Sequence, residues 1–147
     1  IREAVAVRAF YELVYDRLVD DDGLSYLTGG VNVYPEQGPR DASFPYIVQS
    51  LTASETNAPW PMRQGRLDMH LWDEAATIER IMGMRDRVVA LLDNWQTSSD
   101  ELGGVRLWLA SESFIPDENH IRHYVLQFIV RLYRVADAEA ILTTEGS

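Results

Sequence analysis

The last third of the chain contains a β-rich run with apolar side chains on both sides. The run is YVLQFIVRLYRV, residues 124–135. Because successive side chains of a strand point to opposite faces, one face carries Tyr124, Leu126, Phe128, Val130 and Leu132. The other carries Val125, Ile129 and Tyr133, interrupted by Gln127 and Arg131. Since a half-exposed strand normally alternates apolar with polar positions, the pattern predicts that both faces are covered at least in part.

Two stretches show the periodicity of amphipathic helices. From Arg2 to Val19, apolar residues recur at helical spacing without glycine or proline. From Glu74 to Trp95 a second apolar series follows, with Asp73 as the expected N-cap. The sequence therefore predicts two main helices.

Four further stretches, residues 44–53, 66–72, 105–115 and 120–135, are typical of strands, and residues 116–119 are expected to join the last two as a hairpin. Between these elements we expect a turn capped by Asp22, a brief apolar segment at 31–34 and a loop at 96–104. Strands joined mostly as hairpins predict a single α+β domain over residues 1–147, with a small antiparallel or mixed sheet and two main α-helices.

Composition limits the functions that fit this chain. With 23 acidic and 13 basic residues the formal net charge is −10, which argues against a surface that grips phosphate backbones. The absence of cysteine excludes disulfides, thiol nucleophiles and thiolate zinc sites. Since no apolar run approaches the ~20 residues needed to cross a bilayer and no leader pattern opens the chain, we expect a soluble, unsecreted protein without a membrane partner.

The candidate catalytic and metal-binding residues do not converge. His120 and His123 are three positions apart, a spacing that sends them to opposite faces of a strand, so we expect no metal site there. Asp68 and His70 share a face and leave an acid and base pair open. The chain lacks a G-x-S-x-G elbow, a Walker loop and a dinucleotide fingerprint. An enzyme is therefore the least favoured function, and we expect no cofactor and no catalytic residue.

Two loops carry large apolar side chains in polar surroundings. In TNAPWPMRQG, Trp60 stands between two prolines and Met62 follows; in SFIPDEN, Phe114 and Ile115 lie near the expected hairpin tip. Tryptophan and methionine are enriched in contact surfaces. Each loop therefore either meets a partner or folds back over the domain's own core, and the residues alone favour neither.

An ordered set of segments resembles the tail-terminator or tail-completion family of long-tailed bacteriophages, prophages and gene-transfer agents. The segments are RAFYELVYDRLVDDDGLSYLTGGVNVYP (8–35), FPYIVQSL (44–51) and GRLDMHLWDEAATIERIMGMRDRVVALLDN (65–94). They share with that family a first helix followed by LTGGVNVYP, a PY opening a strand, a strand that ends in tryptophan and a helix that runs to an aspartate. The resemblance covers roughly residues 5–135 and brings no catalytic motif with it.

The resemblance implies a structural virion protein that forms a homo-oligomeric, six-membered ring on the head-proximal end of the tail tube. Such a ring stops tube polymerisation and joins the tail to the head connector or stopper protein, while DNA passes through its lumen without specific binding. It implies a location in the tail or neck of the virion, after assembly in the host cytoplasm. A head-closure or adaptor protein of the neck is the alternative, and an acidic DNA mimic that inhibits a nuclease is less favoured.

Two arrangements account for the doubly apolar strand. Either one helix covers each face of the sheet, or one face packs on the helices and the other on a neighbouring subunit. The family resemblance favours the second arrangement. The residues expected in a subunit or partner interface are then Trp60, Met62, Phe114, Ile115, Ile129 and Tyr133.

Overall fold

The fold of the chain is taken from a computed structural model, which describes residues 2–30, 32–54, 63–100, 102–116 and 120–133. The elements in chain order are α1 (Arg2–Val19), α2 (Asp22–Thr28), β1 (Val33–Pro35), β2 (Tyr46–Ser54), β3 (Arg63–Glu74), α3 (Glu79–Leu92), β4 (Trp95–Ser99), β5 (Gly103–Ile115) and β6 (Ile121–Tyr133). Trp60 and Met62 lie outside the described residues.

The strands form one sheet in the order β1-β2-β3-β6-β5-β4. β1 runs parallel to β2, and every other neighbouring pair is antiparallel. The sheet is therefore mixed, and the predicted α+β class is confirmed. Two of the six strands, β1 and β4, are the short edge strands, and β1 replaces the expected brief apolar segment.

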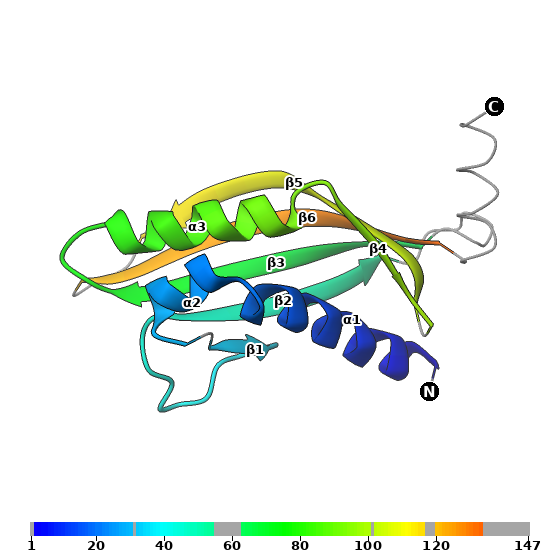
Figure 1. Cartoon of the computed structure of the whole chain (residues 1–147), viewed down its shortest axis with the longest axis horizontal. Coiled ribbons are helices and arrows are strands. Elements are labelled where there is room, and N and C mark those ends of the chain that lie inside the picture. Colours follow the sequence, from blue (N-terminus) through cyan, green and yellow to red (C-terminus); the bar gives the residue numbers. More distant parts are fainter. Residues whose placement is uncertain (1, 31, 55–62, 101, 117–119, 134–147) are drawn as a thin grey trace.

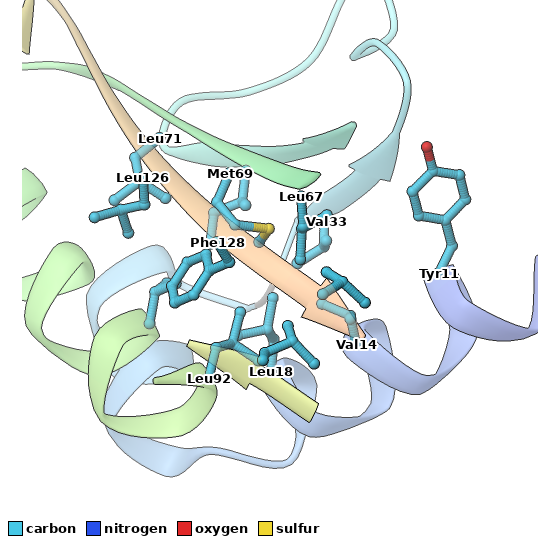
Figure 2. Packing of buried hydrophobic residues seen from close by; sticks show 14 of the residues in the cluster. Tyr11, Val14, Leu18, Val33, Leu67, Met69, Leu71, Leu92, Leu126 and Phe128 are labelled. Carbon is cyan, nitrogen blue, oxygen red and sulfur yellow. The ribbon is translucent and has the colours of Figure 1, made fainter. Parts of the chain in front are cut away.

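All three helices pack on the same face of the sheet (Figure 1). Phe10 of α1, Leu24 of α2 and Val88 of α3 belong to one buried cluster with the inward side chains of the strands. Figure 2 shows the centre of this cluster, where Met69 and Phe128 meet. A helix on each face, the first of the two arrangements open from the sequence, is therefore wrong.

The core face of the sheet follows the predicted alternation. Leu67, Met69 and Leu71 of β3 are fully buried, as are Leu126 and Phe128 of β6. Burying each such side chain stabilises the fold by roughly 1.5–3 kcal/mol, so this layer supplies much of the driving force for folding. One side of the doubly apolar strand β6 is thus covered by the chain's own helices.

The second long helix is shorter than predicted. β3 continues to Glu74, which pairs with Ile121 of β6, and α3 begins only at Glu79. Asp73 is consequently no N-cap; its fully buried carboxylate accepts hydrogen bonds from Arg80 Nε at 3.0 and 3.1 Å. The strand extends because its pairing with β6 satisfies backbone groups that a helix start would leave without partners.

The end of α3 also differs from the prediction. Asn94 adopts a left-handed conformation with φ of 59°, which turns the chain out of the helix. Trp95 therefore belongs to β4 rather than to the helix, and the guanidinium of Arg17 lies 4.8 Å from its ring centroid. Four residues of the expected loop at 96–104 pair with β5 as the rest of β4.

The expected cap of the short second helix is displaced by one residue. Asp21, not Asp22, is the N-cap of α2, and its carboxylate accepts a hydrogen bond from the backbone N–H of Leu24 at 2.8 Å. α2 lies against α3 so closely that a Cβ at Gly83 would stand 3.2 Å from Leu27 Cδ1. The glycine that weakens α3 by roughly 1 kcal/mol relative to alanine thus permits close packing of the two helices.

Candidate subunit interface

The face of the sheet opposite the helices is the candidate interface, and we call it the open face. The register places these residues on it: Tyr46, Val48, Ser50 and Thr52 of β2; Arg66, Asp68, His70 and Trp72 of β3; His123, Val125, Gln127 and Ile129 of β6; Trp108, Ser111, Ser113 and Ile115 of β5. In the part of the chain that the structure describes, no helix packs on this face.

The centre of the open face is an apolar pair flanked by cations. Ile129 of β6 lies directly opposite Trp108 of β5. The guanidinium carbons of Arg106 and Arg131 stand 5.6 and 5.2 Å from the Trp108 ring centroid, which is the geometry of cation–π contacts. The apolar surface is consequently shared between side chains of neighbouring strands, and it mixes aromatic with charged groups.

A second group on the open face is a row of stacked rings across three strands. The rings of Tyr46 and Trp72 have centroids 6.2 Å apart at 18°, and those of Trp72 and His123 are 3.7 Å apart at 12°. Tyr34 of β1 meets Tyr46 edge-on at 6.1 Å. Such ring contacts contribute about 0.5–1.5 kcal/mol each beyond area burial, so they stabilise this end of the open face.

His70 lies beside this row in an apolar setting. Its cross-strand neighbours are Val48 and Val125, both buried although they lie outside the main core. This burial lowers the pKa of the His70 imidazole, and the charge of Asp68 partly opposes the shift. Asp68 itself stands 3.1 Å from Arg66 Nε in an ion pair. Asp68 and His70, the predicted acid and base pair, therefore share a face, but the carboxylate of Asp68 is ion-paired with Arg66.

The far ends of β5 and β6 present two exposed apolar side chains. Phe114 is 42% exposed and Ile115 is 40% exposed. A β-bulge between Leu109 and Ser111 changes the alternation of β5, so that Phe114 lies on the helix side and Ile115 on the open face. The ring of Phe114 meets Tyr124 edge-on at 4.7 Å. These two predicted interface residues are thus accessible, but they look to opposite sides of the sheet.

Behind Phe114, a polar cluster ties β5 to α3. Glu112 accepts hydrogen bonds from Arg85 Nε and Nη2, both at 2.8 Å, and another from the hydroxyl of Tyr124. The bonds from Arg85, with the bond from Tyr124 second, lower the pKa of the Glu112 carboxyl. The hydrogen bonds of this cluster hold the last residues of β5 against α3.

A groove of about 720 Å³ lies on the helix side, between α1 and the β1 edge of the sheet. Val7, Tyr15 and Pro35 supply apolar walls. Tyr11 donates from its hydroxyl to Glu36 Oε1 at 2.6 Å and accepts from the backbone N–H of Leu51 at 2.9 Å. Burial and the bond to Glu36 raise the pKa of Tyr11 to about 12. The side chain of Tyr11 is therefore held in place at the wall of the groove. The groove lies on the helix side of the sheet, whereas Asp68 and His70 lie on the open face.

The structure places the remaining predicted residues as follows. Ile129 lies in the middle of the open face, and Tyr133 is the last residue of β6, in register with Gly104. The sequence did not identify Trp108 and Trp72 as interface residues. The alternation of β3 put Trp72 on the side opposite Leu67, Met69 and Leu71, but the pairing that brings Trp72 beside His123 and Trp108 beside Ile129 became known only from the structure.

The described residues contain neither a cluster of metal ligands nor a membrane-crossing helix. No three side chains of histidine, aspartate or glutamate gather there as metal ligands would. None of the described helices has the length and apolar character needed to cross a membrane.

Comparison with known proteins gives one family and a consistent fold. The family described as "Tail completion protein gp17" matches residues 12–133. A search of curated protein sequences finds no match. A solved structure titled "Virion of native gene transfer agent (GTA) particle" superposes with a TM-score of 0.66 at 18% identity, covering 82% of this chain and 91% of that chain. A second solved structure, whose title states no role, has a TM-score of 0.64 at 14% identity and covers 88% of this chain and 94% of its own.

The two structures confirm the fold, and the family match extends from the middle of α1 to the end of β6. That range contains every strand, both shorter helices and the whole open face. The chain belongs to the tail completion protein gp17 family and is a structural protein of bacteriophage tails.

Proposed function

We propose that this protein forms a ring on the head-proximal end of the phage tail tube. The ring stops tube polymerisation and presents a docking face to the head connector. The role is structural and requires no catalytic residue. The observation that carries the proposal is the one-sided placement of the helices, which leaves the open face of the sheet with Trp72, Trp108 and Ile129 uncovered by any described helix.

The composition of the open face supports a contact between subunits. Tryptophan and arginine are the residue types that most often dominate binding energy in protein interfaces, and the face carries Trp108 between Arg106 and Arg131. A ring requires a heterologous interface, in which two different patches of each subunit meet. The open face is one patch, and Phe114, which is exposed on the helix side near the end of β5, supplies a second. Trp60, Met62 and Tyr133 remain predicted members of the interface.

The size of the sheet suits such a contact. Stable interfaces bury about 1,600 Å² in total, or roughly 800 Å² on each partner. β5 and β6 each span 13 residues, and a strand of that length extends for about 40 Å at ~3.3 Å per residue. A patch two strands wide on each subunit is therefore large enough for a stable ring, and we propose six subunits as the family resemblance implies.

The net charge of −10 fits a ring through which DNA passes. An acidic lumen repels phosphate, so the genome slides through without binding. The proposed partners are thus copies of the chain, the tail tube protein and the head connector, with DNA as a passenger in the lumen. Assembly takes place in the host cytoplasm and the product is located in the tail or neck.

Removal of the gene tests the proposal. Electron microscopy of particles made without it should show overlong tails or tails without heads, and the wild-type gene supplied in trans should restore normal particles. Normal tail length and normal joining in the absence of the gene would exclude tube termination.

A head-closure or adaptor role in the neck is the second candidate, because it uses the same ring geometry. Purified protein should bind the ends of isolated tail tubes if the first proposal is correct. Binding to DNA-filled heads in the absence of tails would favour the second.

A further inference from the structure

Two histidines from distant parts of the chain are hydrogen-bonded on the open face. His70 Nδ1 lies 2.9 Å from His123 Nε2. The register sets His123 opposite Trp72, two residues along β3 from His70, so the two imidazoles meet diagonally across β3 and β6. Their ring centroids are 5.1 Å apart. This separation fits rings joined end to end by one hydrogen bond.

The surroundings hold both rings in place. Val48 and Val125 flank His70 on the neighbouring strands and are only 6% and 8% exposed. Trp72 stacks on His123 with centroids 3.7 Å apart, and Tyr46 stacks on the other side of Trp72. The hydrogen bond is therefore continuous with the stacked row, and a movement of His123 also moves the surface that Trp72 presents.

Among the described residues, the charged groups that face the pair lie on β3. Asp68 and, beyond Trp72, Glu74 lie on the same face of β3. β2 contributes the phenol of Tyr46, and the β5 residues in the adjoining rows, Ser113 and Ile115, are uncharged. The helices pack on the opposite face of the sheet. Protonation of His70 is thus opposed by burial and favoured by Asp68, whose carboxylate is itself paired with the guanidinium of Arg66 on the same face.

The chemistry of imidazole makes this contact sensitive to protons. A neutral imidazole has one N–H donor and one acceptor nitrogen, whereas an imidazolium has two donors and no acceptor. The bond between His70 and His123 persists while one ring remains neutral, and it is lost when both are charged because two donors then repel each other. We propose that the His70–His123 pair is a proton-sensitive clasp that holds the Trp72 stack at neutral pH and releases it when both rings are protonated.

The direction of the pH effect follows from burial. The pKa of His70 lies below its ordinary value of 6.5, mainly because desolvation disfavours the charged ring. As the pH falls below 6.5, His70 in the unfolded chain takes up a proton before His70 in the folded chain does. The stability that the neutral ring contributes above pH 6.5 is therefore lost on acidification. Acidification therefore weakens this end of the open face. The inference concerns the isolated subunit and does not depend on ring formation.

Nuclear magnetic resonance of the full-length, ¹⁵N-labelled protein tests the clasp. Long-range proton–nitrogen spectra recorded between about pH 8 and pH 5 follow each imidazole through its titration range. The remaining histidine, His120, is exposed and lies outside the pair. We expect His70 to titrate below the ordinary imidazole value of 6.5, with His70 and His123 coupled, and the indole N–H signal of Trp72 to shift as the second ring is protonated.

Two variants separate the clasp from general acid effects. His70→Asn should abolish the pH-dependent shift of Trp72, and His120→Asn should leave it unchanged. The proposal is overturned if Trp72 follows the same pH curve in His70→Asn as in the wild type, or if His70 and His123 titrate independently of each other. If His70→Asn does not fold, the wild-type titration alone decides between these outcomes.

Discussion

Arg87 of α3 binds both carboxylate oxygens of Asp21, the residue that caps α2. Arg87 Nη2 lies 2.6 Å from Oδ1 and Nε lies 3.0 Å from Oδ2, while the same Oδ2 accepts the backbone N–H of Leu24. The carboxylate of Asp21 thus caps the N-terminus of α2 and, through its ion pair with Arg87, joins α2 to α3. The bonds from Arg87 are the main reason that the pKa of Asp21 is lowered.

The two roles of Asp21 can be separated by substitution. Asp21→Asn keeps an oxygen for the cap but loses the ion pair, whereas Asp21→Ala loses both. We expect Asp21→Ala to destabilise the fold by about 1–2 kcal/mol, the usual cost of losing a cap, and Asp21→Asn to cost less. The measurement is urea unfolding followed by circular dichroism at neutral pH.

The neighbouring aspartate supplies the control. Asp22 is exposed and lies inside the first turn of α2. Asp22→Ala should therefore change the unfolding free energy by only a few tenths of a kcal/mol, as is usual for surface substitutions. A larger loss with Asp22→Ala than with Asp21→Ala would show that the cap has been assigned to the wrong residue.

Much of this fold was predictable because its elements carry strong local patterns. α1 spans the predicted Arg2–Val19 because its apolar residues recur without interruption. The alternation from Leu67 to Leu71 gave the buried side of β3. β4 was missed because Gln96–Ser99 is polar throughout, and an edge strand needs only backbone pairing on one side. Elements with an uninterrupted apolar pattern, such as α1 and β3, were therefore predicted correctly, whereas the polar strand β4 was not.

The candidate site was less predictable because it depends on contacts between distant strands. Ile129 could be placed on the second face of β6 from the sequence, but its neighbour Trp108 depends on the pairing of β5 with β6 and on a bulge near Leu109. His70 and His123 are 53 positions apart, and a shift of one residue in register would send one of them to the helix side. Register is a tertiary property that local patterns do not determine.

Glu112 should make the stability of the protein depend on acidic pH. Its folded-state pKa lies below the ordinary 4.5 because Arg85 and Tyr124 donate hydrogen bonds to the carboxylate. The unfolded chain therefore binds a proton first as the pH falls, and the stabilisation present above about pH 4.5 is lost below it. Glu112→Gln should lower the unfolding free energy at neutral pH by about 1–3 kcal/mol and flatten this acid dependence.

The exposed Glu79, at the first position of α3, is the matched carboxylate for Glu112. Glu79→Gln should leave the acid dependence close to that of the wild type when melting temperature is recorded across the acidic range. An equal flattening by both substitutions would assign the effect to overall charge rather than to the cluster of Arg85, Glu112 and Tyr124.

Tyr11 should give a corresponding loss of stability at alkaline pH. Burial and the hydrogen bond to Glu36 raise its pKa from 10.0 to about 12. The unfolded chain releases the phenolic proton first, so the stabilisation present below pH 10 is lost as the pH rises toward 12. Absorbance of the phenolate during an alkaline titration should show a component near pH 12, and Tyr11→Phe should remove it. Burial also raises the pKa values of Tyr46 and Tyr124 above their ordinary 10.0, so these two phenols are not part of the early titration.

Tyr11→Phe also leaves the Leu51 N–H without its phenolic partner, so we expect a loss of about 1–3 kcal/mol at neutral pH. Tyr26, which is 88% exposed on α2, is the control residue. Tyr26→Phe should preserve both the late-titrating phenol and the stability. Survival of the late titration in Tyr11→Phe would place that phenol elsewhere in the chain.

Ile129 tests the proposed subunit contact directly. It lies in the middle of the open face, opposite Trp108 and away from the helix layer. Ile129→Asp places a charge where a neighbouring subunit would bury it, and an unpaired buried charge is strongly unfavourable. We expect binding to the ends of isolated tail tubes, or self-association seen by sedimentation, to weaken at least about tenfold, which corresponds to ~1.4 kcal/mol.

The same variant must remain folded for this result to concern the interface. Because Ile129 is only partly buried, the circular dichroism spectrum should be preserved and the melting temperature should fall by only a few degrees. Tyr26→Asp introduces the same charge on the helix side of the molecule and should leave binding unchanged. If Ile129→Asp is folded and binds tube ends like the wild type, the middle of the open face is not the contact, and Phe114, exposed on the helix side of the sheet, becomes the first alternative.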